Sequence, residues 1–182
     1  MAREIIGIAG SVILVAVSWK SLFHPRSHGF SRFFSWECIL VLFLLNVPYW
    51  FREPLAPNQI VSWIFLVASI VLVIAGVRLL KAVGRPSRDR SDETLIAFEK
   101  TSALVTVGAY KYIRHPMYSS LLFLAWGVFL KRFSWVGLGL AGLATLFLFL
   151  TAKRDEAECL KQFGDAYRSY MQGTKRFVPF LF

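Results

Sequence analysis

Five long apolar runs limit what this chain can fold into more than any other feature of its sequence. The runs cover residues 5–23, 33–51, 60–80, 117–130 and 133–152. Four of them have 19 to 21 residues, close to the roughly 20 that a helix needs to cross a bilayer. Only 18% of the residues are charged, whereas a soluble domain usually has about 25%. The sequence therefore predicts an all-α integral membrane protein with about five transmembrane helices.

The fourth run is shorter than the others, with 14 residues. At about 1.5 Å per residue it covers only ~21 Å of a ~30 Å hydrocarbon core. Its helix either continues back through residues 105–112 or begins below the headgroups. Only Lys131 and Arg132 separate this run from the fifth, so residues 117–152 are expected to form a tight helical hairpin.

The chain is short enough to form a single membrane domain, residues 1–182. Three spans fill residues 1–80, a loop with the candidate motif follows at 81–116, and the hairpin precedes a tail at 153–182. In the tail, apolar side chains recur every three or four residues, which is typical of an amphipathic helix. These side chains are Leu160, Phe163, Tyr167 and Tyr170.

The net charge of +10 also fits a membrane protein. If all five runs span, only four of the 21 Lys and Arg residues fall on one side, namely Arg3, Arg52, Lys131 and Arg132. Basic residues concentrate in cytoplasmic loops, where they meet anionic lipids. We therefore expect the N-terminus outside the cell and the C-terminus in the cytoplasm, and no nucleic-acid partner is needed to explain the charge.

The stretch before the fourth run carries the most chemical information. Pro116 is favoured at the first position of a helix, which sets Arg114 and His115 at the helix mouth with free N–H groups that suit an anion. The hairpin should return Asp155 and Glu156 to the same face of the membrane. Basic and acidic groups placed together in this way can hold a zwitterion. The alternative is an interfacial belt of Tyr, Arg and His that anchors the helix, together with a common acidic helix start.

These residues and their spacing resemble a known family. The pattern combines an Arg-His-Pro-x-Tyr motif at 114–118, the apolar hairpin, the acidic pair and a tail that ends in Pro179. It resembles the isoprenylcysteine carboxyl methyltransferase family and, more distantly, the membrane phospholipid N-methyltransferases. The resemblance covers residues 104–179. The first residue of the acidic pair is Asp155 here, where the family has Glu.

The resemblance implies methyl transfer from S-adenosylmethionine to a lipophilic acceptor that enters from the bilayer. Arg114 and Glu156 are the implied catalytic residues. The implied cofactor-binding residues are Gly108, Tyr110, Arg114, His115, Pro116, Tyr118, Asp155 and Glu156. Two alternatives remain open, a non-enzymatic accessory protein on the same scaffold and an NADPH-dependent reductase of the sterol type.

Three further side chains, His24, His28 and Glu37, are candidates for a functional role. His24 and His28 are four residues apart with Pro25 between them, which predicts surface residues rather than metal ligands. Glu37 is a carboxylate within an apolar run, and such a residue is a functional candidate by default. The sequence has no HExxH motif and no CxxC pair, so no metal site is expected.

Overall fold

The computed structural model describes residues 1–85, 96 and 99–179 of the chain, so part of the predicted loop at 81–116 lies outside the described residues. The regular elements are α1 (Ala2–Leu22), α2 (His28–Asn46), η1 (Val47–Tyr49), α3 (Pro57–Ala82), η2 (Gly108–Lys111), α4 (Pro116–Phe129), α5 (Trp135–Phe163) and α6 (Asp165–Gly173). Both η elements are 3-10 turns. The described residues contain no β-strand, which confirms the all-helical class.

Four helices, α1, α2, α3 and α5, are long and apolar enough to cross a membrane. The chain is therefore an integral membrane protein. The shorter helix α4 has 14 residues and begins at Pro116, so it does not continue back through residues 105–112. Because α4 alone is too short for a full span, the count of five spans stays a prediction.

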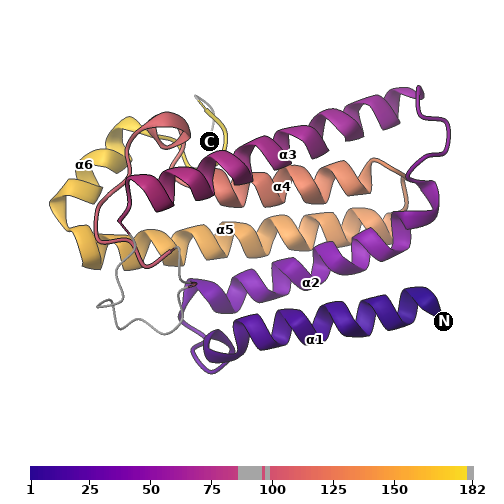
Figure 1. Cartoon of the computed structure of the whole chain (residues 1–182), viewed down its shortest axis with the longest axis horizontal. Coiled ribbons are helices and arrows are strands. Elements are labelled where there is room, and N and C mark those ends of the chain that lie inside the picture. Colours follow the sequence, from indigo (N-terminus) through magenta and orange to yellow (C-terminus); the bar gives the residue numbers. More distant parts are fainter. Residues whose placement is uncertain (86–95, 97–98, 180–182) are drawn as a thin grey trace.

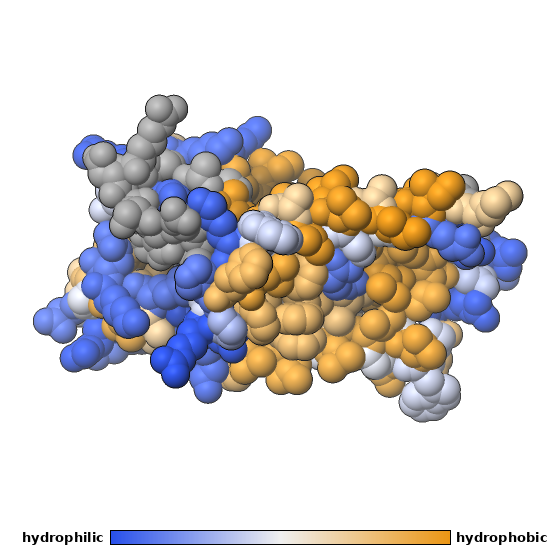
Figure 2. Space-filling model, turned by 90° about the horizontal axis from the view of Figure 1, so that it is seen from below, coloured by the Kyte–Doolittle hydropathy of each residue, from blue (hydrophilic) through white to orange (hydrophobic). Residues whose placement is uncertain are grey.

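The helices lie side by side in the order α1, α2, α5, α4 and α3, and neighbours run antiparallel (Figure 1). We call the end where α1 and α3 finish and α2 and α4 begin the basic end. Helix α6 folds across this end (Figure 1). A broad apolar surface separates the basic end from a smaller hydrophilic region at the opposite end of the bundle (Figure 2).

Small side chains allow α2, α4 and α5 to pack closely in the centre of the bundle. Ala125 of α4 and Ala144 of α5 are completely buried, and both pack against Ile39 of α2. Beside them, the Ser35 hydroxyl donates to the Ala144 carbonyl at 3.4 Å. Since lipid offers no hydrophobic drive between helices, such close contacts and interhelical hydrogen bonds hold membrane bundles together.

The last turn of α4 is capped by side chains from α2 and α3. The four bonds run from Asn46 to the Val128 carbonyl (2.9 Å), Ser62 to Gly127 (2.6 Å), Asn58 to Leu130 (3.0 Å) and Gln59 to Lys131 (3.1 Å). The final carbonyls of a helix have no partner within the helix. In a bilayer such groups must be satisfied by protein, and these caps supply partners for the carbonyls at the end of α4.

The tail differs from the single amphipathic helix expected after the hairpin. Helix α5 continues without a break to Phe163, well past the end of the apolar run at residue 152. Gly164, at a φ of 55°, ends it and starts α6. The predicted tail helix is therefore divided at Gly164. Its apolar side chains still turn inward on both sides of the break, and Tyr167 is buried.

Candidate functional site

A cavity lies at the basic end, where the ends of α2, α3, α4 and α5 meet α6 and the loop around residues 99–105. Five of the sequence-predicted site residues line it: Tyr110, Arg114, His115, Tyr118 and Asp155. They come from η2, the segment before α4, α4 itself and the extended end of α5. The hairpin thus brings the two halves of the sequence pattern to one place.

The other three predicted residues do not line the cavity. Gly108 begins η2 at a φ of 61°, and a Cβ atom there would lie 2.7 Å from a methyl group of Leu79, so glycine lets this turn pack on α3. Pro116 is the first residue of α4 and fixes where that helix starts. Glu156 is buried behind the cavity wall, in contact with two arginines.

Glu156 is held by a network of charged hydrogen bonds. Its carboxylate accepts from Arg114 Nε at 2.9 Å, and from Arg176 through Nε at 3.1 Å and Nη2 at 2.8 Å. The Glu156 side chain is only 6% exposed. A carboxylate shared between two guanidinium groups is strongly bound. The arrangement joins α5 to the motif before α4 and to the C-terminal segment.

The C-terminal segment after α6 runs alongside the motif. Backbone hydrogen bonds join Arg114 N–H to the Lys175 carbonyl (2.8 Å) and His115 N–H to the Arg176 carbonyl (3.2 Å). The Arg114 guanidinium donates to the Thr174 carbonyl, and the Ser119 hydroxyl donates to Phe177 at 2.7 Å. These contacts hold α6 over the cavity.

His115 lies between two carboxylates. Its Nδ1 is 3.4 Å from Asp155 Oδ2, its Nε2 is 3.4 Å from Glu156 Oε1, and its ring stacks on Tyr118 with centroids 5.2 Å apart. Burial lowers the pKa of His115, but the two carboxylates outweigh burial and raise it above its ordinary value. The two carboxylates therefore favour the protonated form of the ring.

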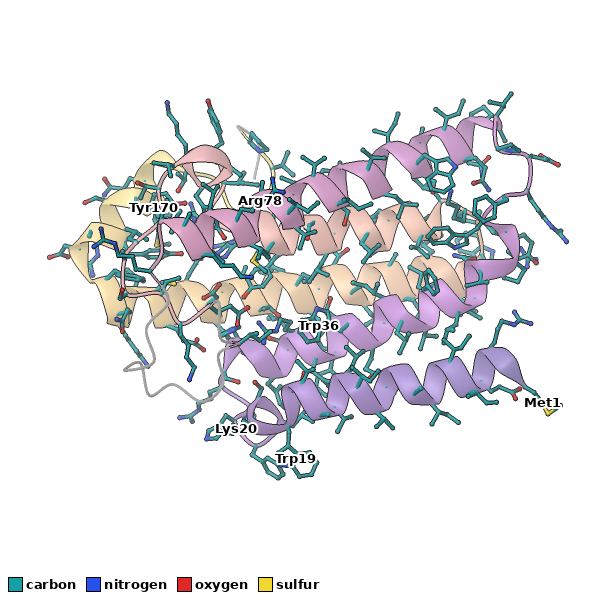
Figure 3. The ribbon with its side chains drawn as sticks, viewed as in Figure 1. Met1, Trp19, Lys20, Trp36, Arg78 and Tyr170 are labelled. Atoms are coloured by element: carbon teal, nitrogen blue, oxygen red, sulfur yellow. The ribbon has the colours of Figure 1, made fainter. Side chains whose placement is uncertain are left out.

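Tyrosine rings form much of the remaining wall. Burial raises the pKa of Tyr110, Tyr167 and Tyr170, so all three phenols stay neutral. Tyr170 projects from α6 over the basic end (Figure 3), and its hydroxyl donates to the Tyr110 carbonyl at 2.6 Å. Neutral aromatic faces attract cations, so the wall suits a ligand with a positive centre.

The structure shows a second cluster of charged side chains at the site, and the sequence analysis did not predict this cluster. His28 is buried, 2.7 Å from Glu158 Oε2 through Nδ1 and 3.7 Å from Glu99 Oε2 through Nε2. Arg32 Nη1 lies 2.5 Å from Glu99 Oε1. Burial raises the pKa of Glu99, but Arg32 and His28 outweigh burial and lower it. His28 and Glu99 both line the cavity.

The prediction that His28 is a surface residue is therefore wrong, whereas His24 is exposed as expected. Burial follows from the fold, because α5 extends past its apolar run and places Glu158 against the first turn of α2. One sequence signal pointed to this. Two basic residues, His28 and Arg32, share one face at the N-terminus of a helix, where cations are unfavourable unless acidic partners are near.

Within the described residues, His28, Asp155 and Glu158 place one potential metal ligand each within 4.8 Å of one another. The His28 ring already pairs with Glu158, so this contact needs no cation to satisfy it. The absence of a metal site stays a prediction. Glu37 does not line the cavity: it accepts from Ser11 at 2.8 Å and joins α1 to α2.

Comparisons with known proteins identify the family of the chain. The chain is similar over 171 residues, at 23% identity, to the protein-S-isoprenylcysteine O-methyltransferase of Dictyostelium discoideum, and the match covers 88% of this chain and 70% of that protein. No solved structure matches significantly. The family model for phospholipid methyltransferase matches residues 58–166, which include α3, the motif, α4 and α5. Since this match covers more than half of the chain, the protein belongs to the phospholipid methyltransferase family of membrane methyltransferases.

Proposed function

We propose that the protein transfers a methyl group from S-adenosylmethionine to a lipophilic acceptor, at the cytoplasmic end of its helical bundle. The observation that carries this proposal is the cavity at the basic end, which combines two carboxylates, one arginine, two histidines and several tyrosine rings beside the apolar surface. The uneven distribution of basic residues supports a cytoplasmic position for this end.

The groups on the cavity wall match the charges of S-adenosylmethionine. Asp155 suits the ammonium group, Arg114 and His115 suit the carboxylate, and the faces of Tyr110 and Tyr167 suit the sulfonium. When bound, the cofactor supplies an electrophilic methyl group. Gly108 and Pro116 act indirectly, because they set the positions of η2 and α4.

The residues of this chain contribute mainly by orientation and exclusion of water. An anionic acceptor needs no base, so alignment and desolvation provide most of the rate. An amine or thiol acceptor must lose a proton, and the cavity wall offers two carboxylates that accept one, Asp155 and Glu99. Glu156 acts indirectly, because it binds Arg114 and Arg176 and so holds the C-terminal segment in place.

Three classes of acceptor fit a site at the cytoplasmic end of a membrane bundle: an isoprenylcysteine carboxylate, a phospholipid amine and a small hydrophobic acid or thiol. The name of the relative from Dictyostelium includes isoprenylcysteine, and the family model is named for phospholipid methylation. Exposed lysines at the basic end, such as Lys20, Lys111 and Lys153, support contact with anionic lipids.

Calorimetric binding of S-adenosylhomocysteine to the detergent-purified protein tests the proposal. We expect the wild type to bind and Asp155→Asn to bind about tenfold or more weakly, because one charge-assisted hydrogen bond contributes roughly 1.5–3 kcal/mol. Asp165→Asn is the matched control, since Asp165 lies on α6 but its side chain is 94% exposed.

Lack of binding by a folded, monodisperse wild type would contradict the proposal. Equal weakening in Asp155→Asn and Asp165→Asn would remove Asp155 from the cofactor site. Activity with a radiolabelled methyl donor and extracted membrane lipids then identifies the acceptor class.

A further inference from the structure

Two arginines converge on one tyrosine at the end of the bundle opposite the basic end. Tyr49 is the last residue of η1, Arg52 follows it in the connection to α3, and Arg132 lies in the turn between α4 and α5. Cζ of Arg52 lies 5.1 Å and Cζ of Arg132 lies 4.3 Å from the centroid of the Tyr49 ring. Both arginines are exposed. Two separate connections of the fold thus place two guanidinium groups around a single ring.

These three side chains offer hydrogen-bond donors without a matching acid. Arg132 Nη1 donates to the Tyr49 hydroxyl oxygen, which leaves the proton of that hydroxyl available to another acceptor. Among the described residues no ion pair includes either arginine, and Glu53 pairs with neither although it follows Arg52 in the chain. Like charges held close together repel, so an anion bound between them is favourable.

A buried glutamine holds the two connections in this arrangement. The side-chain amide of Gln59 donates to the Tyr49 carbonyl and to the Lys131 carbonyl, both at 3.1 Å, and its oxygen accepts from Lys131 Nζ at 3.0 Å. Gln59 and Lys131 are each only 2% exposed. These bonds fix the backbone at Tyr49 and next to Arg132, so the donors are positioned before any ligand binds.

The three donors lie where a bilayer carries its phosphate groups. Candidate membrane spans end at Tyr49 and begin at Trp135, so the donors lie at the boundary between apolar and polar surface. Large apolar side chains flank both arginines: Phe51 is 80% exposed, Phe133 62% and Trp135 79%. Exposed aromatic side chains of this kind are typical of the membrane interface. A ligand that joins a phosphate to a hydrocarbon part fits this surface better than a free anion does.

We propose that Tyr49, Arg52 and Arg132 bind the phosphate of an anionic phospholipid at the end of the bundle opposite the cavity. Two guanidinium groups and a phenolic proton match the oxygens of a phosphate. Since no acid pairs with the arginines in the described part of the chain, a headgroup that adds an ammonium is disfavoured. The bound lipid joins the connection before α3 to the turn before α5, and this inference does not depend on the proposed function.

A fluorophore on Leu55→Cys, in protein with both native cysteines replaced by serine, reports lipid at this end. Leu55 is 84% exposed in the same connection as Arg52. The probe is phosphatidylglycerol with a nitroxide on its acyl chain, which quenches only a fluorophore close to it. The 29 residues of α5 separate the two ends of the bundle by roughly 40 Å, so lipid at the basic end leaves this signal unchanged.

Unlabelled dioleoylphosphatidylglycerol in detergent micelles should displace the probe and restore the fluorescence. Dioleoylglycerol lacks the phosphate, glycerol phosphate lacks the acyl chains, and dioleoylphosphatidylcholine adds an ammonium. We expect each of these three to need about a tenfold higher concentration, because each loses a charged or an apolar part of the contact. Equal competition by dioleoylglycerol would overturn the inference in favour of apolar contact alone. Equal competition by glycerol phosphate would overturn it in favour of a free anion.

Arg132→Gln should weaken competition by phosphatidylglycerol about fivefold, because it removes one charge-assisted contact at an exposed position. Arg3→Gln is the matched control, since Arg3 is an exposed arginine at the same end of the bundle on α1. An equal loss in the two variants would overturn the inference and leave only a general attraction of this end for anions. Thermal unfolding in detergent checks the fold of each variant. If Arg132→Gln does not fold, Tyr49→Phe decides, because unchanged affinity without the hydroxyl would also overturn the inference.

Discussion

At the scale of single residues, opposite charges share a small buried space at the basic end. Arg114, Glu156 and Arg176 hold one another, and His115 lies between Asp155 and Glu156. Buried charges are tolerated only when they are paired, so each member depends on the others. The consequence is that charge changes at this site alter stability as well as activity, and experiments must separate the two.

The His115 pKa, raised above its ordinary value of 6.5, predicts a pH-dependent stability. The folded state holds the proton more tightly than the unfolded state, so the contribution is complete below about pH 6.5 and is lost as pH rises through the raised pKa. Thermal unfolding in detergent between pH 6 and 9 should show the wild type losing stability relative to His115→Gln. His24→Gln, at an exposed ring, should follow the wild type; a constant difference between wild type and His115→Gln would contradict the assignment.

Glu156→Gln should destabilise the protein strongly. The change leaves the guanidinium groups of Arg114 and Arg176, which are 9% and 19% exposed, without their carboxylate, and the loss of a fully buried partner typically costs about 3–5 kcal/mol as an upper limit. A lower melting temperature and faster proteolysis of the segment after α6 would be the measured signs. Glu4→Gln, whose side chain is 78% exposed, should leave both unchanged. A fully stable Glu156→Gln protein without activity would instead assign Glu156 a direct role in the reaction.

Residue-level prediction from the sequence worked where the chain itself brings groups together. The Arg-His-Pro-x-Tyr motif and the acidic pair are joined by a hairpin with a short turn, so their meeting followed from local connections. His28 and Glu99 were missed because their contact depends on how far α5 extends and how the loop before η2 folds back. The burial of Glu156 behind the wall also depends on Arg176, which no local pattern connects to it.

At the scale of elements, α4 shows how a short apolar helix can exist in a membrane. Its last carbonyls receive hydrogen bonds from α2 and α3, and Lys131 at its end donates to Gln59 at 3.0 Å and lies 3.5 Å from the centroid of the Trp63 ring. The sequence predicted the length of this helix but left its starting point open. It did not predict the caps, because the donors are more than 60 residues away in the chain.

Removing a capping side chain should destabilise the bundle more when its hydrogen bond is buried than when it is exposed. Asn46 is buried, so Asn46→Leu removes a buried hydrogen bond to the Val128 carbonyl, which keeps its bond from the Lys131 N–H at 3.2 Å, and should cost about 0.5–1.5 kcal/mol. Asn58 makes the same kind of bond to Leu130 but is exposed, so water or headgroups can replace it in Asn58→Leu. Unfolding in detergent should therefore show a clear decrease for the first variant and a small one for the second. Equal effects would show that depth does not matter here.

At the scale of the whole molecule, the orientation in the membrane is the property that the arrangement of charges predicts best. With both native cysteines replaced by serine, Leu55→Cys and Lys153→Cys place single thiols at exposed positions on opposite ends of the bundle. An impermeant maleimide should label Leu55→Cys in intact cells and Lys153→Cys only after permeabilisation. The reverse pattern would place the cavity outside the cytoplasm.

The all-helical class and most of the helix positions could be predicted from the sequence, because apolar runs of membrane length leave few alternatives. The break at Gly164 could not be predicted in this way. Apolar side chains keep their helical spacing on both sides of it, so the pattern does not mark where α5 ends. The family resemblance supplied what the helix pattern lacked, namely a reason to connect residues 114–118 with residues 155–156.

The capped end of α4 also has a consequence for how the chain is assembled during synthesis. Asn46, Gln59 and Ser62 belong to helices made before α4, so the donors are already in the membrane when the hairpin arrives. A hairpin inserted alone would expose backbone carbonyls to hydrocarbon. The first three helices thus form a template on which the later, site-bearing half of the protein completes its insertion, and fragments that lack them should remain substrates for membrane quality control.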